Sequence, residues 1–376
     1  MKIVVASDSF KGSMTSVEVA QAAAEGIREV YPDGEVVAVN VADGGEGTVE
    51  AIVETLGGEI VVVRVSDPLG RKIIARYGIV DDMAIIEMAA ASGLPLLKID
   101  ERNPWVTSTR GTGEMIMDAI ARGCRRFLVG IGGSATNDAG TGMLQAMGFR
   151  FYDAHGQLIT DCCGGRMADI AVIDGEQVPE AVYKSAFTVA CDVDTPFCGS
   201  EGAAYVFAPQ KGADMEMVAR LDVGMVAFAK VIEKTYGMDV TSMAGAGAAG
   251  GMGGGFYAFL NARLKRGVDM VLDAIDFDSI IRGADLVITG EGKIDYQTVK
   301  GKTAAGVLAR AKAQDIPVVA IAGRGEMCDS VAQMGFAGVY PIMENEMPLA
   351  VAMQPDFAAA NVEKTVKKIV TNLHIS

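Results

Sequence analysis

The chain has 376 residues, of which 50% are hydrophobic and 22% are charged, and its net charge is −15. So high an apolar content excludes a mainly disordered chain, because buried apolar surface can offset the entropy lost on folding. The acidic balance and the lack of a Lys/Arg-rich run argue against a nucleic-acid partner. At about 150 residues per domain, the length predicts two or three domains.

Targeting and metal signals are weak throughout the sequence. The apolar run at the N-terminus, residues 1–8, is too short for a signal peptide. The longest charge-free stretch, between Asp239 and Arg263, holds seven glycines and makes a poor membrane helix. The six cysteines form neither a disulfide framework nor a zinc-site spacing. We expect a reduced, cytoplasmic protein with no membrane partner.

The first part of the chain alternates short apolar strands with helical periodicity. The expected elements, in order, are a strand at 3–6, a helix at 16–30, a strand at 36–39, a helix at 45–56 and a strand at 59–65. This β-α-β-α-β order predicts the first half of a doubly wound sheet.

The middle of the chain contains strands that pair through hairpins, which predicts a mixed sheet. The expected elements are strands at 71–80 and 84–88, a helix at 111–122, a strand at 127–132, a hairpin at 149–159, a strand at 187–191 and a helix at 214–236.

Regular alternation returns near residue 285. The expected elements are strands at 286–289, 318–322 and 339–342, and helices at 303–313, 327–334 and around 362–373. The sequence therefore predicts an α/β protein with a discontinuous Rossmann-like domain, residues 1–65 plus 283–376, whose parallel sheet has six strands. A second α/β domain with a mixed sheet, residues 66–282, interrupts it. A ligand cleft between two such domains is a common arrangement.

Histidine catalysis is improbable, because the two histidines are His155 in a predicted turn and His374 near the C-terminus. Acid–base chemistry must then fall to carboxylates, lysine or cysteine. Cys191 has no adjacent basic partner and is expected to be a small buried residue.

Two polar, glycine-rich segments follow the first two predicted strands, where open α/β sheets bind ligands. The first contains Ser9 and Lys11, and could hold an anionic substrate; the alternative is an N-capping turn. The second contains Asp43 and Gly44 ahead of a helix, and could present backbone N–H groups to an anion; the alternative is a helix cap followed by a turn.

Two further segments follow strands of the middle section. Residues 130–140 combine small residues with hydroxyl and amide groups, which suits a phosphate cradle better than a structural glycine turn. Asp192 and Asp194 follow the strand at 187–191, and could supply a general base and a Mg²⁺ ligand for phosphoryl transfer; the alternative is an Asx-turn.

Two glycine patterns imitate nucleotide motifs. Gly301-Lys302-Thr303 ends like a P-loop, but Tyr296 stands where the first glycine belongs, so the match fails, although Lys302 could still meet a phosphate. Residues 245–250 match G-x-G-x-x-G without a preceding buried strand, so we expect a flexible glycine-rich loop or lid rather than a dinucleotide site. From the residues alone, phosphoryl transfer to a small acidic or hydroxylated acceptor fits best.

Eight motifs in fixed order cover nearly the whole chain. They are DSFKG (8–12), ADGGEGT (42–48), GTGE (111–114), GGSATND (132–138), CDV (191–193), QKG (210–212), GAAGGMGGG (247–255) and TGEGKIDYQT (289–298). In this order they closely resemble the bacterial glycerate kinase family, the type found in glyoxylate and sugar-acid catabolism. The sequence departs from the family pattern after CDV, where Thr195-Pro196-Phe197 follow Asp194, and after the Asn-Asp pair, where Ala139-Gly140 stand.

The resemblance implies ATP-dependent, Mg²⁺-assisted phosphorylation of D-glycerate, commonly to 2-phosphoglycerate, in an interdomain cleft. It implies substrate contacts by Ser9, Lys11, Asp43 and Gly44, with Lys11 holding the carboxylate, and a base role for Asp192. The nucleotide side it implies comprises Gly132, Gly133, Ser134, Asn137, Asp138, Glu291, Asp295 and Lys302.

Alternatives stay open at this point. The acceptor could be another small hydroxy acid, or the product 3-phosphoglycerate. A NAD-dependent dehydrogenase that uses residues 245–250 and a non-catalytic sugar-acid sensor are the rivals from other functional classes. The sequence is compatible with a homo-oligomer and does not determine which residues bind the metal.

Overall fold

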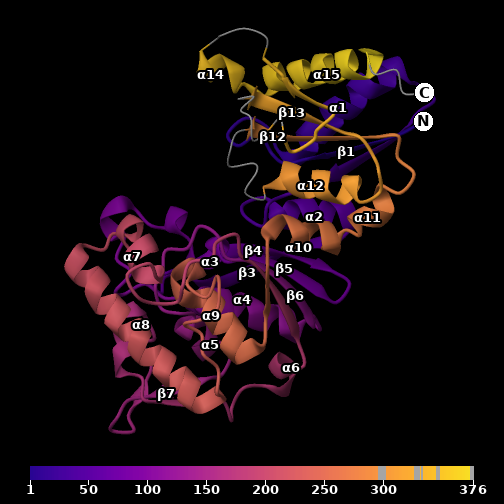
Figure 1. Cartoon of the computed structure of the whole chain (residues 1–376). Coiled ribbons are helices and arrows are strands. Elements are labelled where there is room, and N and C mark those ends of the chain that lie inside the picture. Colours follow the sequence, from indigo (N-terminus) through magenta and orange to yellow (C-terminus); the bar gives the residue numbers. More distant parts are fainter. Residues whose placement is uncertain (295–301, 326–330, 332, 344–347, 373–376) are drawn as a thin grey trace. The chain divides into compact units, whose positions relative to one another are not determined.

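A computed structural model describes all residues except 295–301, 326–330, 332, 344–347 and 373–376. The chain divides into two compact units (Figure 1). The first unit comprises Met1–Asp43, Glu50–Leu56 and Val268–Ser376, and the second comprises Gly44–Val49 and Gly57–Gly267.

The first unit is built on a parallel sheet with the strand order β14-β13-β12-β1-β2. Its strands are β1 (Lys2–Ser7), β2 (Glu35–Asn40), β12 (Leu286–Ile294), β13 (Val318–Gly325) and β14 (Gly338–Pro341). Helices α1 (Ser16–Val30) and α15 (Pro355–Asn372) pack on one face of this sheet, where Val362, Val366 and Ile369 of α15 are buried in the hydrophobic core. A capping box between Thr15 and Glu18 starts α1.

The prediction of six strands in this parallel sheet is wrong, since the sheet has five strands among the described residues. The missing strand, β3 (Glu59–Ser66), belongs to the second unit and pairs antiparallel with β4 (Lys72–Val80). A tight turn at 67–70 causes this, because the Asp67 carboxylate accepts from the N–H groups of Leu69 and Arg71. A strand tied to its neighbour by so short a turn joins that neighbour's sheet.

The second unit contains a sheet with the strand order β11-β10-β6-β5-β4-β3. The sequence predicts a mixed sheet in this part of the chain, and this sheet is mixed. Strands β5 (Met83–Glu87), β6 (Arg126–Gly130), β10 (Ala186–Ala190) and β11 (Arg263–Lys265) run parallel, while β3 and β4 run antiparallel to their neighbours. A separate sheet, β8-β7-β9, contains the predicted hairpin; its strands are β7 (Arg150–Tyr152), β8 (Leu158–Ile159) and β9 (Val172–Asp174).

The helices of the second unit surround one continuous hydrophobic core. The helices of this unit are α3 (Ala89–Ser92), η1 (Leu94–Leu96), η2 (Ile99–Glu101), α4 (Arg110–Ala121), α5 (Thr141–Ala146), η3 (Gly164–Asp169), α6 (Glu180–Tyr183), α7 (Ala203–Phe207), η4 (Pro209–Lys211), α8 (Met215–Tyr236) and α9 (Ala248–Leu260). The remaining helices lie wholly or mostly in the first unit: α2 (Thr48–Leu56), α10 (Gly267–Ala274), α11 (Phe277–Ile280), α12 (Thr303–Lys312) and α14 (Leu349–Ala352). The predicted helix at 327–334 lies mostly outside the described residues.

Residues 245–250, predicted as a flexible loop or lid, are a turn at 245–247 followed by the start of α9, and they are largely buried, which does not fit an exposed lid. Ala249, Gly250 and Gly251 have positive φ and interrupt α9. A Cβ on Gly250 would overlap with the carbonyl oxygen of Thr136, and one on Gly255 with that of Ala139. The glycines are therefore needed where α9 packs against the segment 136–139.

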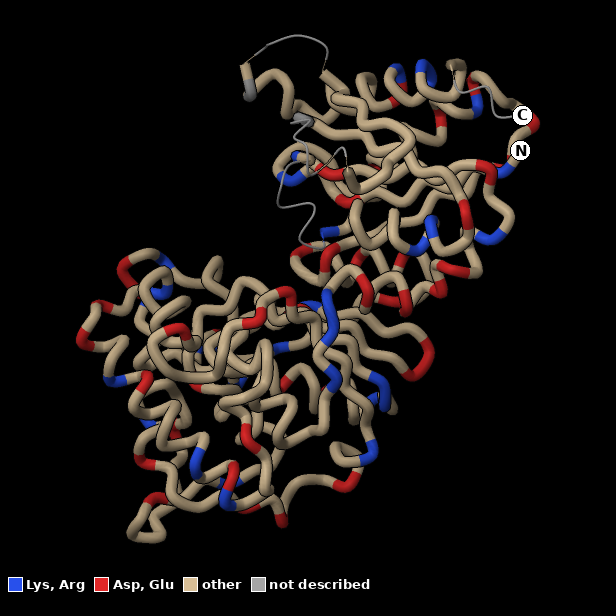
Figure 2. Tube along the Cα trace, in the orientation of Figure 1, with Lys and Arg blue, Asp and Glu red and all other residues tan. Residues whose placement is uncertain are grey.

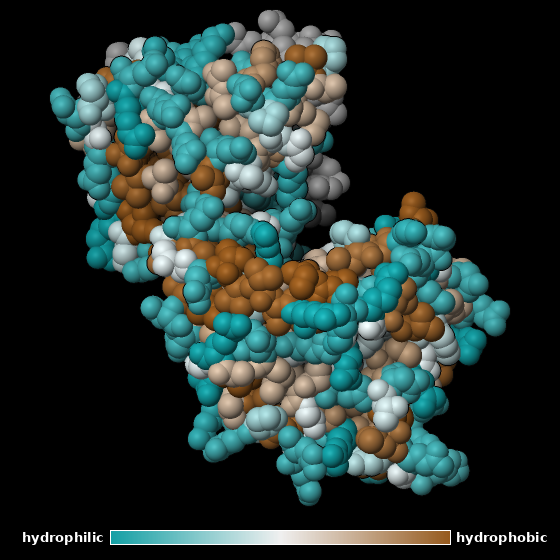
Figure 3. Space-filling model, turned by 180° about the vertical axis from the view of Figure 1, so that it is seen from behind, coloured by the Kyte–Doolittle hydropathy of each residue, from teal (hydrophilic) through white to brown (hydrophobic). Residues whose placement is uncertain are grey.

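Lys and Arg residues alternate with Asp and Glu residues along the chain of each unit (Figure 2). Hydrophobic residues also reach the surface of both units (Figure 3); on β3 and β4 these include Ile60, Val62 and Ile74. Among the described residues no helix is both long and apolar enough to cross a membrane.

Candidate active site

Asp8 is the central carboxylate at one edge of the first unit's sheet. It follows β1 directly, and its side chain is 6% exposed. The Asp8 carboxylate accepts hydrogen bonds from the Ser9 N–H at 2.7 Å and the Thr303 hydroxyl at 2.9 Å. Burial and the negative charge of Asp43 raise the pKa of Asp8, whereas these two donors and Lys11 act in the opposite direction. The site is thus suited to a ligand that brings positive charge or donors.

Lys11 and Asp43 lie beside this carboxylate. The Lys11 Nζ is 3.5 Å from Asp43 Oδ2, and the lysine side chain is 65% exposed. Since β1 and β2 are parallel neighbours, the segments that follow them meet at one sheet edge. The structure therefore brings together Ser9, Lys11 and Asp43, three of the residues predicted to bind substrate.

The predicted nucleotide residues of the first unit lie at its middle strand and the helix that follows. Glu291 is 5% exposed near the end of β12, one residue beyond Gly290, whose carbonyl accepts from the Asp8 N–H. Lys302 is the N-cap residue of α12, next to Thr303. Asp295 lies outside the described residues.

A second group of predicted residues lies at the carboxyl ends of parallel strands in the second unit. The pairing aligns Glu87, Gly130, Ala190 and Lys265 across β5, β6, β10 and β11. Gly44 fits closely against these ends, because a Cβ on Gly130 would overlap with its carbonyl oxygen. A Cβ on Gly44 would itself come within 2.7 Å of Ala190 Cβ, and its φ of +84° also requires glycine. Close packing thus explains this glycine without a ligand.

Asp192 and Glu87 supply carboxylates at this edge. Asp192, two residues after β10, is exposed, and its Oδ1 accepts from the Gly267 N–H at 2.9 Å. Glu87 ends β5 and accepts from the Val49 N–H at 3.1 Å. Sequence reasoning missed Glu87, although a carboxylate at the end of an apolar strand was the available signal.

The first residues of segment 132–138 are exposed, and its later residues are buried. Gly132 and Gly133 are exposed, and in the part of the chain that the structure describes no atom lies within 4 Å of a Cβ built on Gly132. Ser134 is 6% exposed, and its Oγ accepts from the Nζ of Lys211 at 2.7 Å. Asn137 is fully buried; its amide nitrogen donates to the Met225 sulfur, while its Oδ1 has no hydrogen-bond partner among the described residues. The residues free to meet a ligand are thus at the start of the segment.

Asp138 is fully buried and holds protein segments together. Its carboxylate accepts from the N–H and the hydroxyl of Thr109, each at 2.8 Å, and from the N–H groups of Gly140 and Gly142, each at 3.2 Å. Burial raises the pKa of Asp138, and the four donors act in the opposite direction. These contacts join the start of α4 to the start of α5, so Asp138 has a structural role and we do not propose that it contacts nucleotide.

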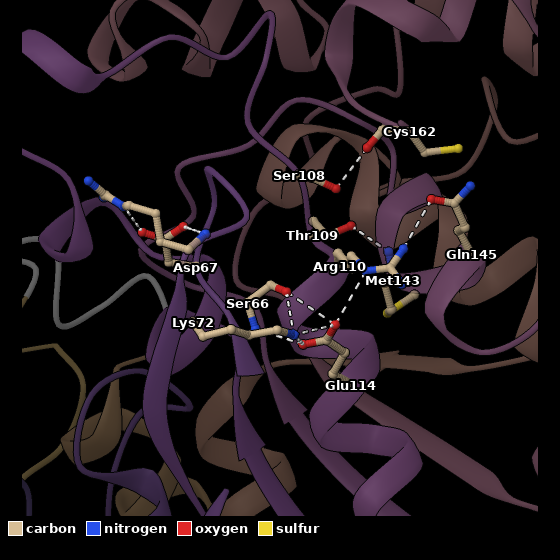
Figure 4. A network of polar contacts seen from close by, with 11 residues as sticks. Ser66, Asp67, Lys72, Ser108, Thr109, Arg110, Glu114, Met143, Gln145 and Cys162 are labelled. Atoms are coloured by element: carbon tan, nitrogen blue, oxygen red, sulfur yellow. Dashed lines mark hydrogen bonds and ion pairs between the residues drawn. The ribbon is translucent and has the colours of Figure 1, made fainter. Parts of the chain in front are cut away.

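The GTGE motif fixes α4 in the position that Asp138 requires. Glu114 accepts from Ser66 N and Oγ at 2.6 and 3.1 Å, and pairs with Lys72 and Arg110 (Figure 4). A Cβ on Gly111 would overlap with the Ser66 carbonyl oxygen, so only glycine permits this approach. The motif therefore stabilises the scaffold beneath segment 132–138.

Carboxylates are also the groups from which a metal site would be built. Among the described residues, no group of three or more His, Cys, Asp and Glu side chains is arranged to hold a metal ion. Asp8 and Asp43 offer two carboxylates, the number that Mg²⁺ commonly takes from a protein when nucleotide phosphates complete its coordination. The donor set of the first unit thus fits a nucleotide-bound Mg²⁺.

Comparison with known proteins shows the relationships of the chain. The model of the glycerate kinase family matches residues 3–374. The chain belongs to the glycerate kinase family. It is 45% identical to a glycerate kinase of Bacillus subtilis, over 100% of this chain and 98% of the relative, and 45% identical to the glycerate 2-kinase of Escherichia coli, over 91% of each chain.

A solved structure gives the same result for the fold. A crystal structure from Salmonella typhimurium LT2, of a protein assigned as glycerate kinase 2, superposes with a TM-score of 0.91 and 43% identity, covering 99% of this chain and 98% of that one. The α/β fold and the resemblance inferred from the sequence are confirmed. The protein is a phosphotransferase of this family, and membership implies the use of ATP.

Family membership also bears on the rival functions. The dehydrogenase hypothesis rested on residues 245–250, whose glycines are explained by packing against the segments around Thr136 and Pro196. No feature of the described residues remains that favours a dinucleotide site.

Proposed function

We propose that this chain transfers the γ-phosphoryl group of ATP to a hydroxyl of D-glycerate, with 2-phosphoglycerate as the favoured product. The observation that supports the proposal is that Asp192 and segment 132–138 each follow one of two neighbouring strands. Both follow neighbouring parallel strands, β10 and β6, whose last residues, Ala190 and Gly130, are paired. A base and a phosphate-binding loop at one sheet edge are the two groups that phosphoryl transfer needs close together.

The proton step belongs to Asp192. Its Oδ1 is held by the Gly267 N–H, and Asp192 is exposed. Oδ2 would accept the proton of the glycerate hydroxyl as the oxygen attacks the γ-phosphorus, and the bond to the ADP oxygen breaks in the same step. The fixed carboxylate also orients that hydroxyl, which favours in-line attack.

Segment 132–138 of the second unit would bind the phosphate groups of ATP. Exposed backbone at Gly132 and Gly133, with open space next to Gly132, allows close approach of phosphate oxygens. Ser134 supplies a hydroxyl donor. The proposal keeps Lys302 and Glu291 as nucleotide-side residues of the first unit, and Asp295 as a prediction on residues that lie outside those described.

The carboxylate of glycerate is assigned to Lys11. This ammonium group is 65% exposed and lies beside Asp43, so it can bind a small anion while Ser9 binds a hydroxyl group; Asp43 keeps its place on the substrate side through its ion pair with Lys11. Asp8 and Asp43 would hold the Mg²⁺ of the nucleotide, which when bound neutralises negative charge on the transferring phosphate. That the reaction occurs in a cleft between two domains stays a prediction.

A coupled ADP-release assay with D-glycerate, L-glycerate and no acceptor tests this function. We expect ADP formation that depends on D-glycerate, and a phosphorus NMR spectrum of 2-phosphoglycerate. A spectrum of 3-phosphoglycerate would keep the kinase and reverse the choice of hydroxyl. ADP formation that is equal with and without glycerate would overturn the assignment of acceptor.

A further inference from the structure

Lys211 is a buried lysine that the proposed mechanism does not use. It ends η4 and is 1% exposed, whereas lysine side chains almost never lie fully inside a protein unless they are paired. Its Nζ donates to Ser134 Oγ at 2.7 Å and to the Thr136 carbonyl oxygen at 2.6 Å. The Phe207 ring covers it at 6.0 Å. Both of these hydrogen bonds are made to segment 132–138, so this lysine restrains the conformation of that segment.

Burial of this amine is costly, which indicates a function beyond packing. Loss of solvation lowers the pKa of Lys211 to about 7, and the buried carboxylate of Asp138 opposes the shift. A methionine would fill similar space without this cost. The QKG motif that contains Lys211 is one that the proposed function leaves unexplained.

The hydrogen bond to Ser134 restricts the hydroxyl group. An Oγ that accepts from Nζ cannot direct its own hydrogen at that N–H, so the hydrogen must point elsewhere. Lys211 is the partner that the structure gives for Ser134 Oγ among the described residues. The hydroxyl hydrogen is therefore left to donate to an oxygen that arrives from the exposed side of Gly132 and Gly133.

We propose that Lys211 is a positioning residue that holds Ser134 as a hydrogen-bond donor toward the phosphate groups of ATP. The second bond, to the Thr136 carbonyl, fixes the backbone of the same segment. Lys211 does not touch the nucleotide in this account; it acts through Ser134. The inference rests on the proposed function, because it assumes that segment 132–138 meets phosphate.

A double-mutant cycle on the full chain tests the proposal. The variants are Lys211→Met, Ser134→Ala and the double variant, each assayed for kcat and for the KM values of ATP and D-glycerate. We expect each single substitution to raise the KM for ATP about tenfold, the cost of losing one hydrogen bond to a charged group. The double variant should be no worse than either single variant, and the KM for D-glycerate should stay unchanged.

Ser185→Ala is the control, because it removes a serine hydroxyl of the second unit whose Oγ donates to the Ala181 carbonyl oxygen at 2.8 Å, outside the contacts assigned to segment 132–138. This variant should leave the KM for ATP unchanged. Should Lys211→Met fail to fold, Lys211→Gln, which keeps an N–H donor, and Ser134→Ala still test the pair. A KM for ATP that stays at the wild-type value in Lys211→Met, or in Ser134→Ala should the Met variant not fold, overturns the proposal, and so do losses that multiply in the double variant.

A direct measurement of ATP affinity separates this inference from the proposed function. Calorimetric titration with ATP should show weaker binding to the Lys211 variant than to the wild-type protein. If the wild-type protein forms no glycerate-dependent ADP but this difference is present, the acceptor assignment fails and the role of Lys211 stands. If glycerate-dependent ADP forms and the affinities are equal, the role of Lys211 fails alone.

Discussion

Removal of the Asp138 carboxylate is predicted to lower the free energy of unfolding of the second unit without directly changing the contacts to the nucleotide. In Asp138→Ala, four protein donors lose their acceptor: Thr109 N–H and hydroxyl, Gly140 N–H and Gly142 N–H. Each unsatisfied buried donor costs about 1–3 kcal/mol of folding free energy. Part of this loss is offset, because the variant no longer buries a negative charge away from water. We expect the free energy of unfolding to fall by about 4 kcal/mol or more.

Asp138→Asn should cost much less, because three of the four donors meet a single oxygen, Oδ2. An asparagine whose amide oxygen takes that position faces its amide nitrogen only toward the Gly140 N–H. One mismatched donor predicts a loss of about 1–3 kcal/mol. The order wild type, Asn, Ala is therefore the expected order of stability.

Urea unfolding followed by fluorescence measures both variants. Trp105, the one tryptophan in the chain, lies in the second unit with Arg220 at 4.1 Å from its ring, so its emission reports this unit. Asp82→Asn is the control, since Asp82 is 52% exposed in an ion pair with Arg126 and should cost about 1 kcal/mol at most. An Asp138→Ala variant as stable as the wild-type protein, but unable to bind ATP, would refute the structural role.

Three further predictions concern single side chains. Lys11→Met should raise the KM for D-glycerate by about 10-fold or more, because a charge-assisted hydrogen bond is lost; Lys184→Met, also 65% exposed and paired with Glu180, should leave it unchanged, and equal effects would remove Lys11 from the site. Gly132→Ala should keep stability within about 0.5 kcal/mol, since its Cβ meets open space, while raising the KM for ATP; an unaltered KM would mean that phosphate does not approach there. Between pH 7 and 10.5, Lys211 is protonated in the unfolded chain but not in the folded protein. The free energy of unfolding should therefore rise by about 1.4 kcal/mol per pH unit in this range. Lys211→Met should abolish this slope in urea titrations.

Local patterns predicted most elements correctly, but the sheet to which a strand belongs depends on distant partners. The β-α-β pattern at the start of the chain gave correct elements, yet β3 joined the other sheet because the turn at 67–70 ties it to β4. The order of the first unit's strands brings β12 next to β1, across more than 280 residues of sequence. Hydrophobic periodicity does not encode pairings of this kind.

Polar side chains near glycines were the signal for the candidate site, and the signal does not separate ligand contacts from internal ones. Ser9, Lys11, Asp43 and Asp192 lie at the predicted strand ends. Asp138 carries the same signal but binds four protein donors, and Gly44 is required by close packing. Lys211 was overlooked as a site residue, because a lone lysine in a turn-like tripeptide does not reveal that it will be buried.

Turnover by Asp192→Asn is the most direct test of the proposed chemistry. The substitution keeps the shape of the side chain and its acceptor for the Gly267 N–H, but removes the base. Asp222→Asn is the matched control, since Asp222 likewise accepts from one peptide N–H, that of Gly199. We predict that Asp192→Asn lowers kcat for D-glycerate by about 10²–10⁴-fold with an unchanged urea midpoint, and that Asp222→Asn keeps near-normal turnover. Near-normal kcat in Asp192→Asn would contradict the assignment of this carboxylate as the base.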